Sequence, residues 1–569
     1  MTADAPADGG LRGSIAERWT QTRGPLFTDM YELAMAQVYV ADGIADRTAQ
    51  FDYFFRSTPD YGTHQAGYCV SAGLGPFLSW LDSLSIDGAH IEALRSMTNP
   101  VGTPVFSETF LHWLSMPDRF AGIEVRAVAE GRVVHPHEPI VSVTGPLAVS
   151  QLLETSLLNH FNYPTLIATK AARVVRSARG GTVLEFGMRR GPATGVNEGI
   201  RAALIGGCAS TSNVEAAIAL GRQPIGTHAH ALVQAYMAMG DGELGAFRAM
   251  AATTPDECIL LVDTVDTLDS GVPNAITVFD ELRAGGHQPV GVRLDSGDLA
   301  YLAVQTAKML DDAGYPDVSI VLSSDLDELN IWQILTQIGD DAERLGIDPG
   351  PIRRRLVYGV GTRLITSQGS SALNGVYKLV GVEDRDGEWT PAIKISEDPG
   401  KVPLPGRKTV WRLYDLRGAA IVDLIGLADE EPFPTDTIAV HHPNSAGISQ
   451  TIRRSDVSHI EVLHDVVFGD GTGAAVGSVP GETVPGETEP GETVPGETVS
   501  AGMVPGETVS AGMVPAGMVS IDELAERCTA DLDRLDVGVR RLVNPHRYHV
   551  SITTRLRDLR ARLVADARP

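Results

Sequence analysis

The sequence predicts an α/β protein whose central part, between about residues 180 and 380, forms a (β/α) barrel. Two observations support this fold class. Short runs rich in Val, Ile and Leu alternate with stretches of helical periodicity, and they are apolar throughout, as in a parallel sheet covered on both faces. Polar residues then follow the ends of these runs. The expected strands are 182–187, 223–227, 258–263, 288–294, 318–323 and 354–359, and GVYKLV at 375–380 is a further candidate.

The polar residues at the expected strand ends predict where the functional site lies. In a barrel the carboxyl ends of the strands converge on one face, and that face carries the active site. Six strand ends contribute, so we expect one shared site. The residues are Arg189 and Arg190, His228 and His230, Asp263, Arg293 and Asp295, Ser323 to Asp325, and Gly359 to Thr362.

Length and composition set the broad class of protein. A chain of 569 residues is long enough for two or three domains. Its net charge of −26 opposes binding to nucleic acid or to an anionic membrane, so a phosphate-bearing ligand must meet a local basic pocket. No secretory signal, membrane-spanning run or CxxC spacing is present, which predicts a cytoplasmic protein without a disulfide framework or a thiolate zinc site.

Two segments are expected to lie outside the packed domains. Residues 1–20 have the composition of a flexible tail. Within an insertion at about 466–519, PGET and SAGMVP units recur between Gly471 and Met518, too rich in Pro, Gly and Glu to bury a core. We therefore expect this insertion to be disordered. Helical periodicity resumes after it, so the chain is expected to end in helices.

The stretch from Arg293 to Asp298 places a guanidinium, two carboxylates and a hydroxyl directly after an apolar run. Alternate residues of a strand point to the same face, so a structural ion pair between Arg293 and Asp295 is one interpretation. The functional alternative is a ligand site, in which a carboxylate holds magnesium on a pyrophosphate. The glycine at 297 favours close approach of the backbone to a ligand.

Two further motifs allow both a structural and a functional interpretation. The glycine-rich stretch from Tyr358 to Arg363 is typical of a backbone that cradles phosphate, or of a tight strand-to-helix turn. His228 and His230 are spaced as a metal pair on a strand, but no third ligand accompanies them. One of them is instead a candidate phosphate acceptor or acid/base group, and His228 a candidate structural histidine. Asp263 and Asp266 receive no assigned role.

Taken together, these motifs resemble the nicotinate phosphoribosyltransferase family of type II phosphoribosyltransferases. The resemblance spans nearly the whole chain, and its pieces occur in the family's order. They are Phe27 to Leu33, Phe51 to Arg56, Glu185 to Arg190, Ser210 to Val214, Gly226 to His230, Arg293 to Asp298, Tyr358 to Thr362, Tyr377 to Leu379, and Asn544 to His546.

The resemblance implies an irregular (β/α) barrel with an additional α/β domain built from N-terminal and C-terminal segments. Its implied boundaries are 21–165 for the N-terminal domain and 166–395 for the barrel. Segments 396–465 and 520–569 would pack on the N-terminal domain. The family further implies a head-to-tail homodimer whose active sites are completed across the interface.

The family also implies a site for nicotinate. Tyr31 from the partner subunit and Phe186 would stack around the pyridine ring, and Arg293 would grip its carboxylate. Ser212 stands where nicotinamide-using relatives carry an aspartate, which favours the acid over the amide.

The remaining implied residues serve the other substrates. Asp295 and a magnesium ion would orient the ribose, and His230 would be phosphorylated by ATP to drive the reaction. The product would be nicotinate mononucleotide for NAD synthesis. The alternatives are a nicotinamide or quinolinate enzyme of the same fold, or an inactive barrel acting as a binding subunit. The residues implied for 5-phosphoribosyl 1-diphosphate are Arg189, Ser323, Ser324, Gly359, Gly361 and Thr362.

Overall fold

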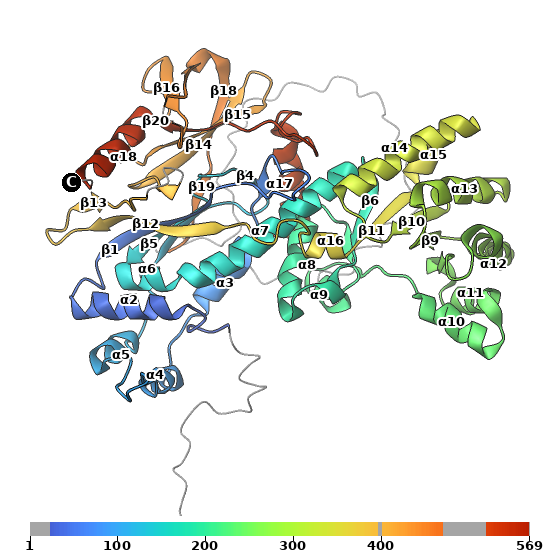
Figure 1. Ribbon diagram of the computed structural model, residues 1–569, viewed down its shortest axis with the longest axis horizontal. Helices are drawn as coiled ribbons and strands as arrows, with labels where there is room; N and C mark the ends of the chain where they lie inside the picture. The colour runs from blue at the N-terminus through green and yellow to red at the C-terminus, as the bar shows by residue number, and fades with distance from the viewer. Residues whose placement is uncertain (1–22, 397–400, 446, 470–518, 568–569) are drawn as a thin grey trace, which may run out of the picture.

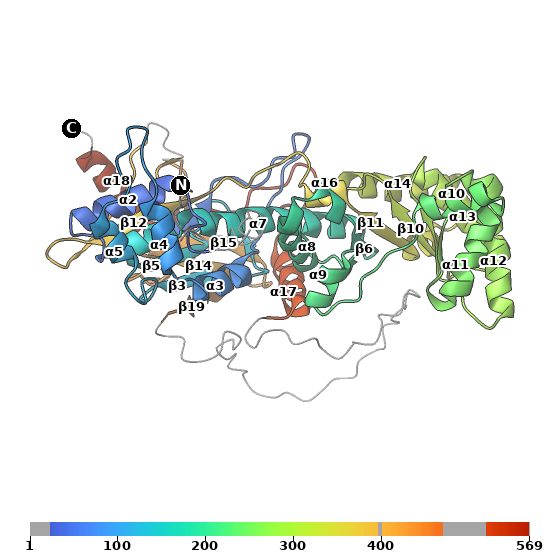
Figure 2. The same cartoon turned by 90° about the horizontal axis from the view of Figure 1, so that it is seen from below.

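The computed structural model describes residues 23–396, 401–445, 447–469 and 519–567. The molecule is elongated, with two sheets and their helices in one part and a parallel sheet with its helices in the other (Figures 1 and 2). Helix α7 (Glu154–Ser177) runs between the two parts. The expected tail at 1–20 and the repeats at 471–518 lie outside the described residues.

The parallel sheet is the predicted barrel in the form of an open half-barrel. All five strand pairs are parallel, so the carboxyl ends of the six strands lie along one edge. The fold class predicted from the sequence is thereby confirmed. The strand order is β7 (Ser210–Thr211), β6 (Thr182–Glu185), β11 (Leu356–Val360), β10 (Ser319–Ser323), β9 (Gly291–Leu294) and β8 (Ile259–Leu261).

Two of the predictions of barrel strands are wrong. Residues 223–227 form no strand, although Ile225 N–H donates to the Thr211 carbonyl, so this segment runs beside β7 without a ladder. GVYKLV does form a strand, β12 (Gly375–Glu383), but it pairs antiparallel with β1 (Thr48–Phe55) in the other part of the molecule. Apolar periodicity identifies a strand without identifying its partner.

Helices cover the outer face of the half-barrel because alternate strand residues point outward into one large apolar core. Val292, Leu294, Ile320, Leu322 and Tyr358 all belong to this core. The helices of this part are α8 (Val196–Ile205), α9 (Val214–Ala219), α10 (His230–Met239), α11 (Gly242–Thr253), α12 (Val272–Ala284), α13 (Leu299–Asp312), α14 (Glu328–Leu345), α15 (Pro349–Arg354) and α16 (Thr362–Ile365).

The other part contains an antiparallel sheet assembled from distant stretches of the chain. Its order is β13 (Trp389–Pro391), β12, β1, β5 (Val141–Pro146), β3 (Glu124–Val128) and β19 (His464–Phe468). Strand β19 thus extends into the range expected for the insertion. The helices here are α2 (Met30–Ala41), α3 (Leu74–Asp82), α4 (Gly88–Arg95), α5 (Glu108–Leu114) and α6 (Leu147–Leu152).

A third, mixed sheet packs beside the antiparallel one. Its order is β17 (Ser449–Arg453), β16 (Thr437–His441), β20 (Val550–Thr553), β15 (Ala420–Leu427), β14 (Lys408–Asp415) and β18 (Val457–Val462), and β2 (Cys69–Val70) pairs with β4 (Val133–Val134) separately. Helices α17 (Ile521–Arg534) and α18 (Thr554–Asp566) follow the repeats, as the periodicity predicts. No described helix is long and apolar enough to cross a membrane.

A buried ionic cluster joins the two parts of the molecule. Glu328, at the start of α14, is fully buried and lies 2.6 Å from Lys170 Nζ and 3.1 Å from Arg173 Nε of α7. His64 Nε2, from the loop after β1, lies 2.8 Å from the same carboxylate. One carboxylate therefore connects three segments that are far apart in the sequence.

Candidate active site

Strand alternation places four predicted site residues on the inner face of the half-barrel. Val292 and Leu294 are buried under the outer helices, so Arg293 between them points inward. Ser323 of β10 and Gly359 of β11 are register partners, and Phe186 directly follows β6. Arg293, Ser323, Gly359 and Phe186 therefore lie across four neighbouring strands.

Three oxygen acceptors hold the Arg293 guanidinium. Its Nε donates to Ser323 Oγ, one Nη to Thr227 Oγ1 and the other Nη to Asp295 Oδ1, each at 2.9 Å. An arginine has five N–H donors, so these bonds leave one N–H on each terminal nitrogen. The side chain is 15% exposed, which allows these two donors to meet a substrate carboxylate.

Asp295 is held in its ionised form. Partial burial alone would raise its pKa, but hydrogen bonds from the Ser323 hydroxyl and the Arg293 guanidinium lower the pKa below the usual value. Arg293 and Asp295 are thus the same-face ion pair of the structural interpretation. The pair lies at the strand ends, where the functional interpretation places a ligand.

Asp263, to which the sequence assigned no role, organises the site. Its Oδ1 lies 3.1 Å from His230 Nε2, and its Oδ2 accepts from the Asp295 amide at 2.9 Å and from Ser296 Oγ at 2.6 Å. Its side chain is 2% exposed, whereas that of His230 is 38% exposed. Asp263 therefore orients an accessible imidazole and connects it to the loop after β9.

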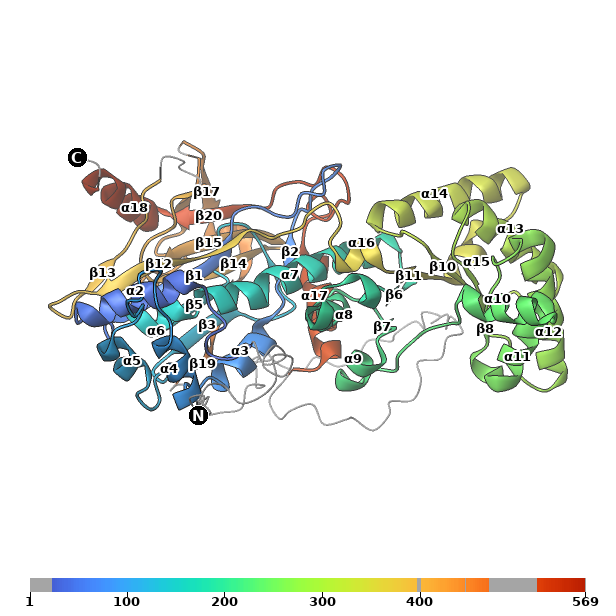
Figure 3. The same ribbon diagram turned by 60° about the horizontal axis from the view of Figure 1, so that its bottom comes forward.

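His228 has a structural role. Its Nε2 accepts a hydrogen bond from the Leu261 amide at 3.0 Å, and burial lowers the pKa of the ring, so the imidazole is neutral. His228 and Ile225 hold the connection between α9 and α10 against the two edge strands of the sheet (Figure 3). Ile225 bonds to β7 and His228 to β8. The same connection supplies Thr227 to Arg293 and positions His230 at the start of α10.

The glycine-rich stretch at the end of β11 fits around Phe186. A Cβ at Gly359 would lie 2.5 Å from the Phe186 ring, and one at Gly361 would lie 3.1 Å from the Phe186 carbonyl oxygen. Phe186 N–H also donates to the Val360 carbonyl. Packing against Phe186 therefore explains a glycine at 359.

The residues expected to bind phosphate lie around the same edge. Arg189 is exposed in the short helix Met188–Arg190 and has no ion-pair partner among the described residues. Ser324 and Asp325 both adopt positive φ angles, 97° and 47°, a strained conformation for residues other than glycine and one that is frequent at functional sites. Thr362 is the first residue of α16.

Tyr31 lies on α2, in the part of the molecule opposite the half-barrel (Figures 1 and 3). Within one chain it is therefore remote from Phe186. It is 48% exposed, and its neighbours Met30 and Val38 are 49% and 62% exposed. Ser212 is at the half-barrel, where its amide donates to the Glu185 carbonyl at 3.0 Å.

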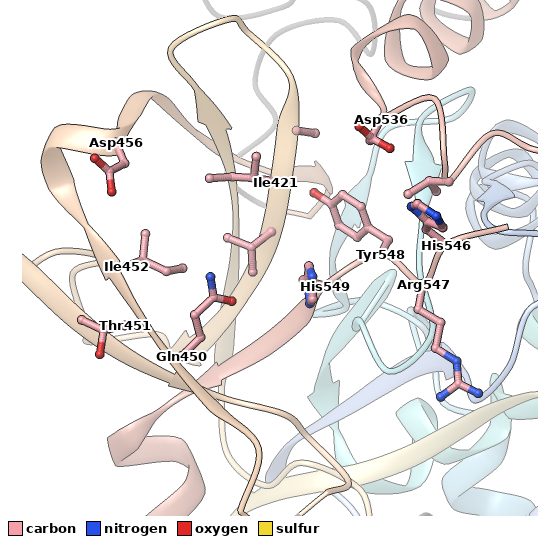
Figure 4. A pocket seen from close by; sticks show the side chains of 13 residues that line it. Ile421, Gln450, Thr451, Ile452, Asp456, Asp536, His546, Arg547, Tyr548 and His549 are labelled. Carbon is pink, nitrogen blue, oxygen red and sulfur yellow. The ribbon is translucent and has the colours of Figure 1, made fainter.

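A separate cavity of about 370 Å³ lies between the mixed sheet and the loop 536–549. Ile421 and Ile452 line its sheet side, and Tyr548 and His549 its loop side (Figure 4). It contains none of the predicted site residues. His546 of the Asn544 to His546 motif is also in its wall, where its ring packs on Gly538 and stabilises the loop.

Comparison with known proteins assigns the fold. The crystal structure of human nicotinic acid phosphoribosyltransferase matches 94% of this chain and 99% of its own, with a TM-score of 0.70 and 27% identity. A nicotinate-nucleotide pyrophosphorylase from Pyrococcus furiosus shares the fold with a TM-score of 0.57 at 19% identity, covering 92% of this chain and 98% of its own. The half-barrel and its strand-end site therefore define an enzyme of the type II phosphoribosyltransferase fold.

Sequence comparison identifies the family. Family models match residues 26–162 (nicotinate phosphoribosyltransferase N-terminal domain), 182–413 (nicotinate phosphoribosyltransferase family), and 407–477 with 505–560 (the C-terminal domain). A Bacillus subtilis nicotinate phosphoribosyltransferase is 40% identical over 448 residues, 78% of this chain and 84% of the relative. A Caenorhabditis elegans relative of the same name is 32% identical, covering 79% and 84%. The chain belongs to the nicotinate phosphoribosyltransferase family.

Proposed function

We propose that the protein joins nicotinate to 5-phosphoribosyl 1-diphosphate, forming nicotinate mononucleotide and diphosphate for NAD synthesis. The observation that carries this proposal is Arg293, whose guanidinium is fixed by three acceptors and keeps one N–H on each terminal nitrogen. This arrangement matches a planar carboxylate. Phe186, on the same inner face of the half-barrel, offers a ring for stacking on a flat pyridine.

The proposed reaction is a displacement at ribose C1. The pyridine nitrogen forms the new bond while the bond from C1 to the diphosphate oxygen breaks, through an oxocarbenium-like transition state. The protein contributes mainly positioning and electrostatic stabilisation. Arg189, Ser323, Ser324, Gly361 and Thr362 are proposed to hold the phosphate groups, and Gly359 to admit the Phe186 ring beside them.

Magnesium is proposed to enter with the diphosphate. The described residues contain no cluster of three or more His, Cys, Asp or Glu that could hold a metal ion. Magnesium commonly binds through one or two carboxylates and substrate phosphates, and the ionised Asp295 fits that requirement. When bound, the ion would offset negative charge on the departing diphosphate.

His230 is proposed to couple ATP hydrolysis to the transfer. If Nε2–H donates to Asp263, the lone pair is on Nδ1, which would take the γ-phosphoryl group as ADP leaves. His230→Ala is then expected to keep basal transfer and lose its stimulation by ATP. Stimulation that survives in this variant would exclude the role.

The active site is proposed to be completed by a second copy of the chain, arranged head to tail. Tyr31 is too remote from Phe186 to act within one chain, and α2 leaves Met30, Tyr31 and Val38 exposed. Helix α10, which begins at His230, has no charged residue after its first position and buries only Val233. Exposed apolar helices of this kind mark protein interfaces.

The first experiment supplies purified protein with 5-phosphoribosyl 1-diphosphate, magnesium, and either nicotinate or nicotinamide, with and without ATP. Product formation from nicotinate, increased by ATP, is the expected result. Product from nicotinamide alone would reassign the base and the role of Ser212. If neither base yields a mononucleotide, the protein is an inactive barrel and the proposal fails.

A further inference from the structure

Behind the proposed nicotinate site lies a buried carboxylate to which the proposed reaction assigns no role. Glu185, the last residue of β6, is fully buried, as is its register partner Thr211 of β7. Burial raises the pKa of Glu185 above its usual value. Such a group is costly to bury unless hydrogen bonds satisfy it, so its partners are informative.

The two carboxylate oxygens of Glu185 accept hydrogen bonds from different segments, the turn after β6 and strand β7. Oε1 accepts from the Gly187 amide, and Oε2 accepts from Thr211 Oγ1 at 2.6 Å. Thr211 Oγ1 in turn accepts from the Asn213 amide at 3.1 Å. A continuous chain of hydrogen bonds therefore runs from residue 187 through Glu185 and Thr211 to residue 213.

The residues joined by these hydrogen bonds flank two residues of the proposed nicotinate site. Phe186 lies between Glu185 and Gly187, and Ser212 lies between Thr211 and Asn213. The backbone adds a further link, because the Ser212 amide donates to the Glu185 carbonyl at 3.0 Å. The turns after β6 and β7 are thus held in one arrangement through the Glu185 side chain.

We infer that Glu185 is a positioning residue that, through Thr211, fixes Phe186 and Ser212 relative to each other and thereby sets selectivity for the aromatic acid. This inference rests on the proposed function. Glu185 itself touches no substrate, because it is buried beneath the two turns. Disrupting the hydrogen bonds of Glu185 should weaken recognition of the nicotinate ring. Binding of the phosphate groups of 5-phosphoribosyl 1-diphosphate near β10 and α16 should be unaffected.

The test removes the linking hydroxyl with little change of shape. Thr211→Val deletes the donor, Thr211→Ser retains it, and Glu185→Gln retains volume but loses one acceptor oxygen. Thr306→Val is the matched control, because Thr306 is equally buried on α13 and its hydroxyl has no hydrogen-bond partner among the described residues. We measure KM for nicotinate and for 5-phosphoribosyl 1-diphosphate separately, and the turnover of nicotinamide.

Thr211→Val and Glu185→Gln are expected to raise KM for nicotinate by about tenfold, because each breaks the series of hydrogen bonds that positions Phe186 and Ser212. KM for 5-phosphoribosyl 1-diphosphate should stay within about twofold, and Thr211→Ser and Thr306→Val should resemble the wild type. Equal shifts of both KM values, or a Thr211→Val variant that matches Thr306→Val, would overturn the inference.

Amide hydrogen exchange separates failure of this inference from failure of the proposed function. If wild-type protein makes no mononucleotide, the proposed function fails, and exchange alone then decides the positioning role. Faster exchange at residues 187 and 213 in Thr211→Val, restored in Thr211→Ser, supports the link. Unchanged exchange there overturns it, and if Thr211→Val does not fold, Glu185→Gln supplies the same readout.

Discussion

Arg293 has five N–H donors, and the fold engages three of them. The sequence could predict the position of this residue because a charged side chain directly follows an apolar run. It could not predict that Thr227 and Ser323 fix the guanidinium plane, or that Asp263 orients His230. Those contacts join residues thirty or more positions apart, and local patterns contain no information about them.

Replacing Arg293 with lysine should raise KM for nicotinate by about tenfold to a hundredfold, because one ammonium cannot reproduce the planar fork. KM for 5-phosphoribosyl 1-diphosphate should change little. Steady-state kinetics with each substrate varied in turn measures both constants. Arg344→Lys, in an exposed pair on α14, is the control. A lysine variant with unchanged KM for nicotinate would remove Arg293 from base recognition.

Glu32, beside Tyr31, predicts a pH dependence of stability. Burial and the neighbouring Glu154 carboxylate raise its pKa from 4.5 to about 7, while Gln151 Nε2 donates to it at 2.6 Å. A carboxyl that binds its proton more tightly when folded loses stabilisation as pH rises from its unfolded pKa to its folded pKa. The free energy of unfolding of Glu32→Gln minus that of the wild type should therefore rise between pH 4.5 and about 7.

Urea unfolding at pH 5, 6, 7 and 8 provides the measurement, and the exposed Glu215→Gln provides the control. The difference curve of the control should be flat over this range. A flat curve for Glu32→Gln as well would contradict the raised pKa.

Among the elements, most strands of the half-barrel could be predicted from the sequence. The conformations of residues 210–211 and 223–227 could not. Five of the six expected strands form, as β6, β8, β9, β10 and β11. Three of them, at 258–263, 318–323 and 354–359, contain at least three consecutive apolar residues. The segment 223–227 has a single branched apolar residue beside a proline and is fastened by individual hydrogen bonds instead. Strand β7 has only two residues, Ser210 and Thr211, too few and too polar for periodicity to identify.

The junction between α7, α14 and the loop around His64 depends on one carboxylate. Burial alone would raise the pKa of Glu328, but His64, Lys170 and Arg173 lower it well below the usual range. Glu328→Gln leaves two buried cations without a counter-charge and should lower the free energy of unfolding by about 3–5 kcal/mol. Denaturant unfolding measures this loss. Asp341→Asn, which breaks the Arg344 surface pair, should cost at most about 1 kcal/mol.

At the scale of the whole molecule, the proposed head-to-tail dimer predicts complementation between two defective variants. In such a dimer, Tyr31→Ala and Arg293→Ala are each expected to impair every site of their own homodimer. In a mixed dimer, one site combines an intact Arg293 with an intact Tyr31 from the other chain. Random pairing of equal amounts should therefore restore about one quarter of wild-type activity.

The complementation experiment co-expresses the two variants with different tags and assays the dimers that carry both tags. Activity restored in the doubly tagged species supports a shared site. If that species is no more active than the two homodimers, Tyr31 does not act across the interface.

The repeats at 471–518 should not contribute to chemistry. Every residue proposed for catalysis or binding lies between Tyr31 and Thr362, and the repeats follow all of them in sequence. Replacing 471–518 with a glycine–serine linker of equal length should leave kcat and both KM values within about twofold. A larger loss would assign the repeats a part in activity or assembly.

The two parts of the molecule also differ in when they can form during synthesis. The strands of the half-barrel all lie between Thr182 and Val360, so the ribosome completes this sheet as one block. The antiparallel sheet begins earlier, with β1 at Thr48, but must wait for β12 and finally for β19, which ends at Phe468. Until those strands emerge, β1 and β3 each leave one backbone edge unpaired in the nascent chain. The antiparallel sheet is therefore begun before the half-barrel but closes after it, and its unpaired edges are where a chaperone would have most to protect.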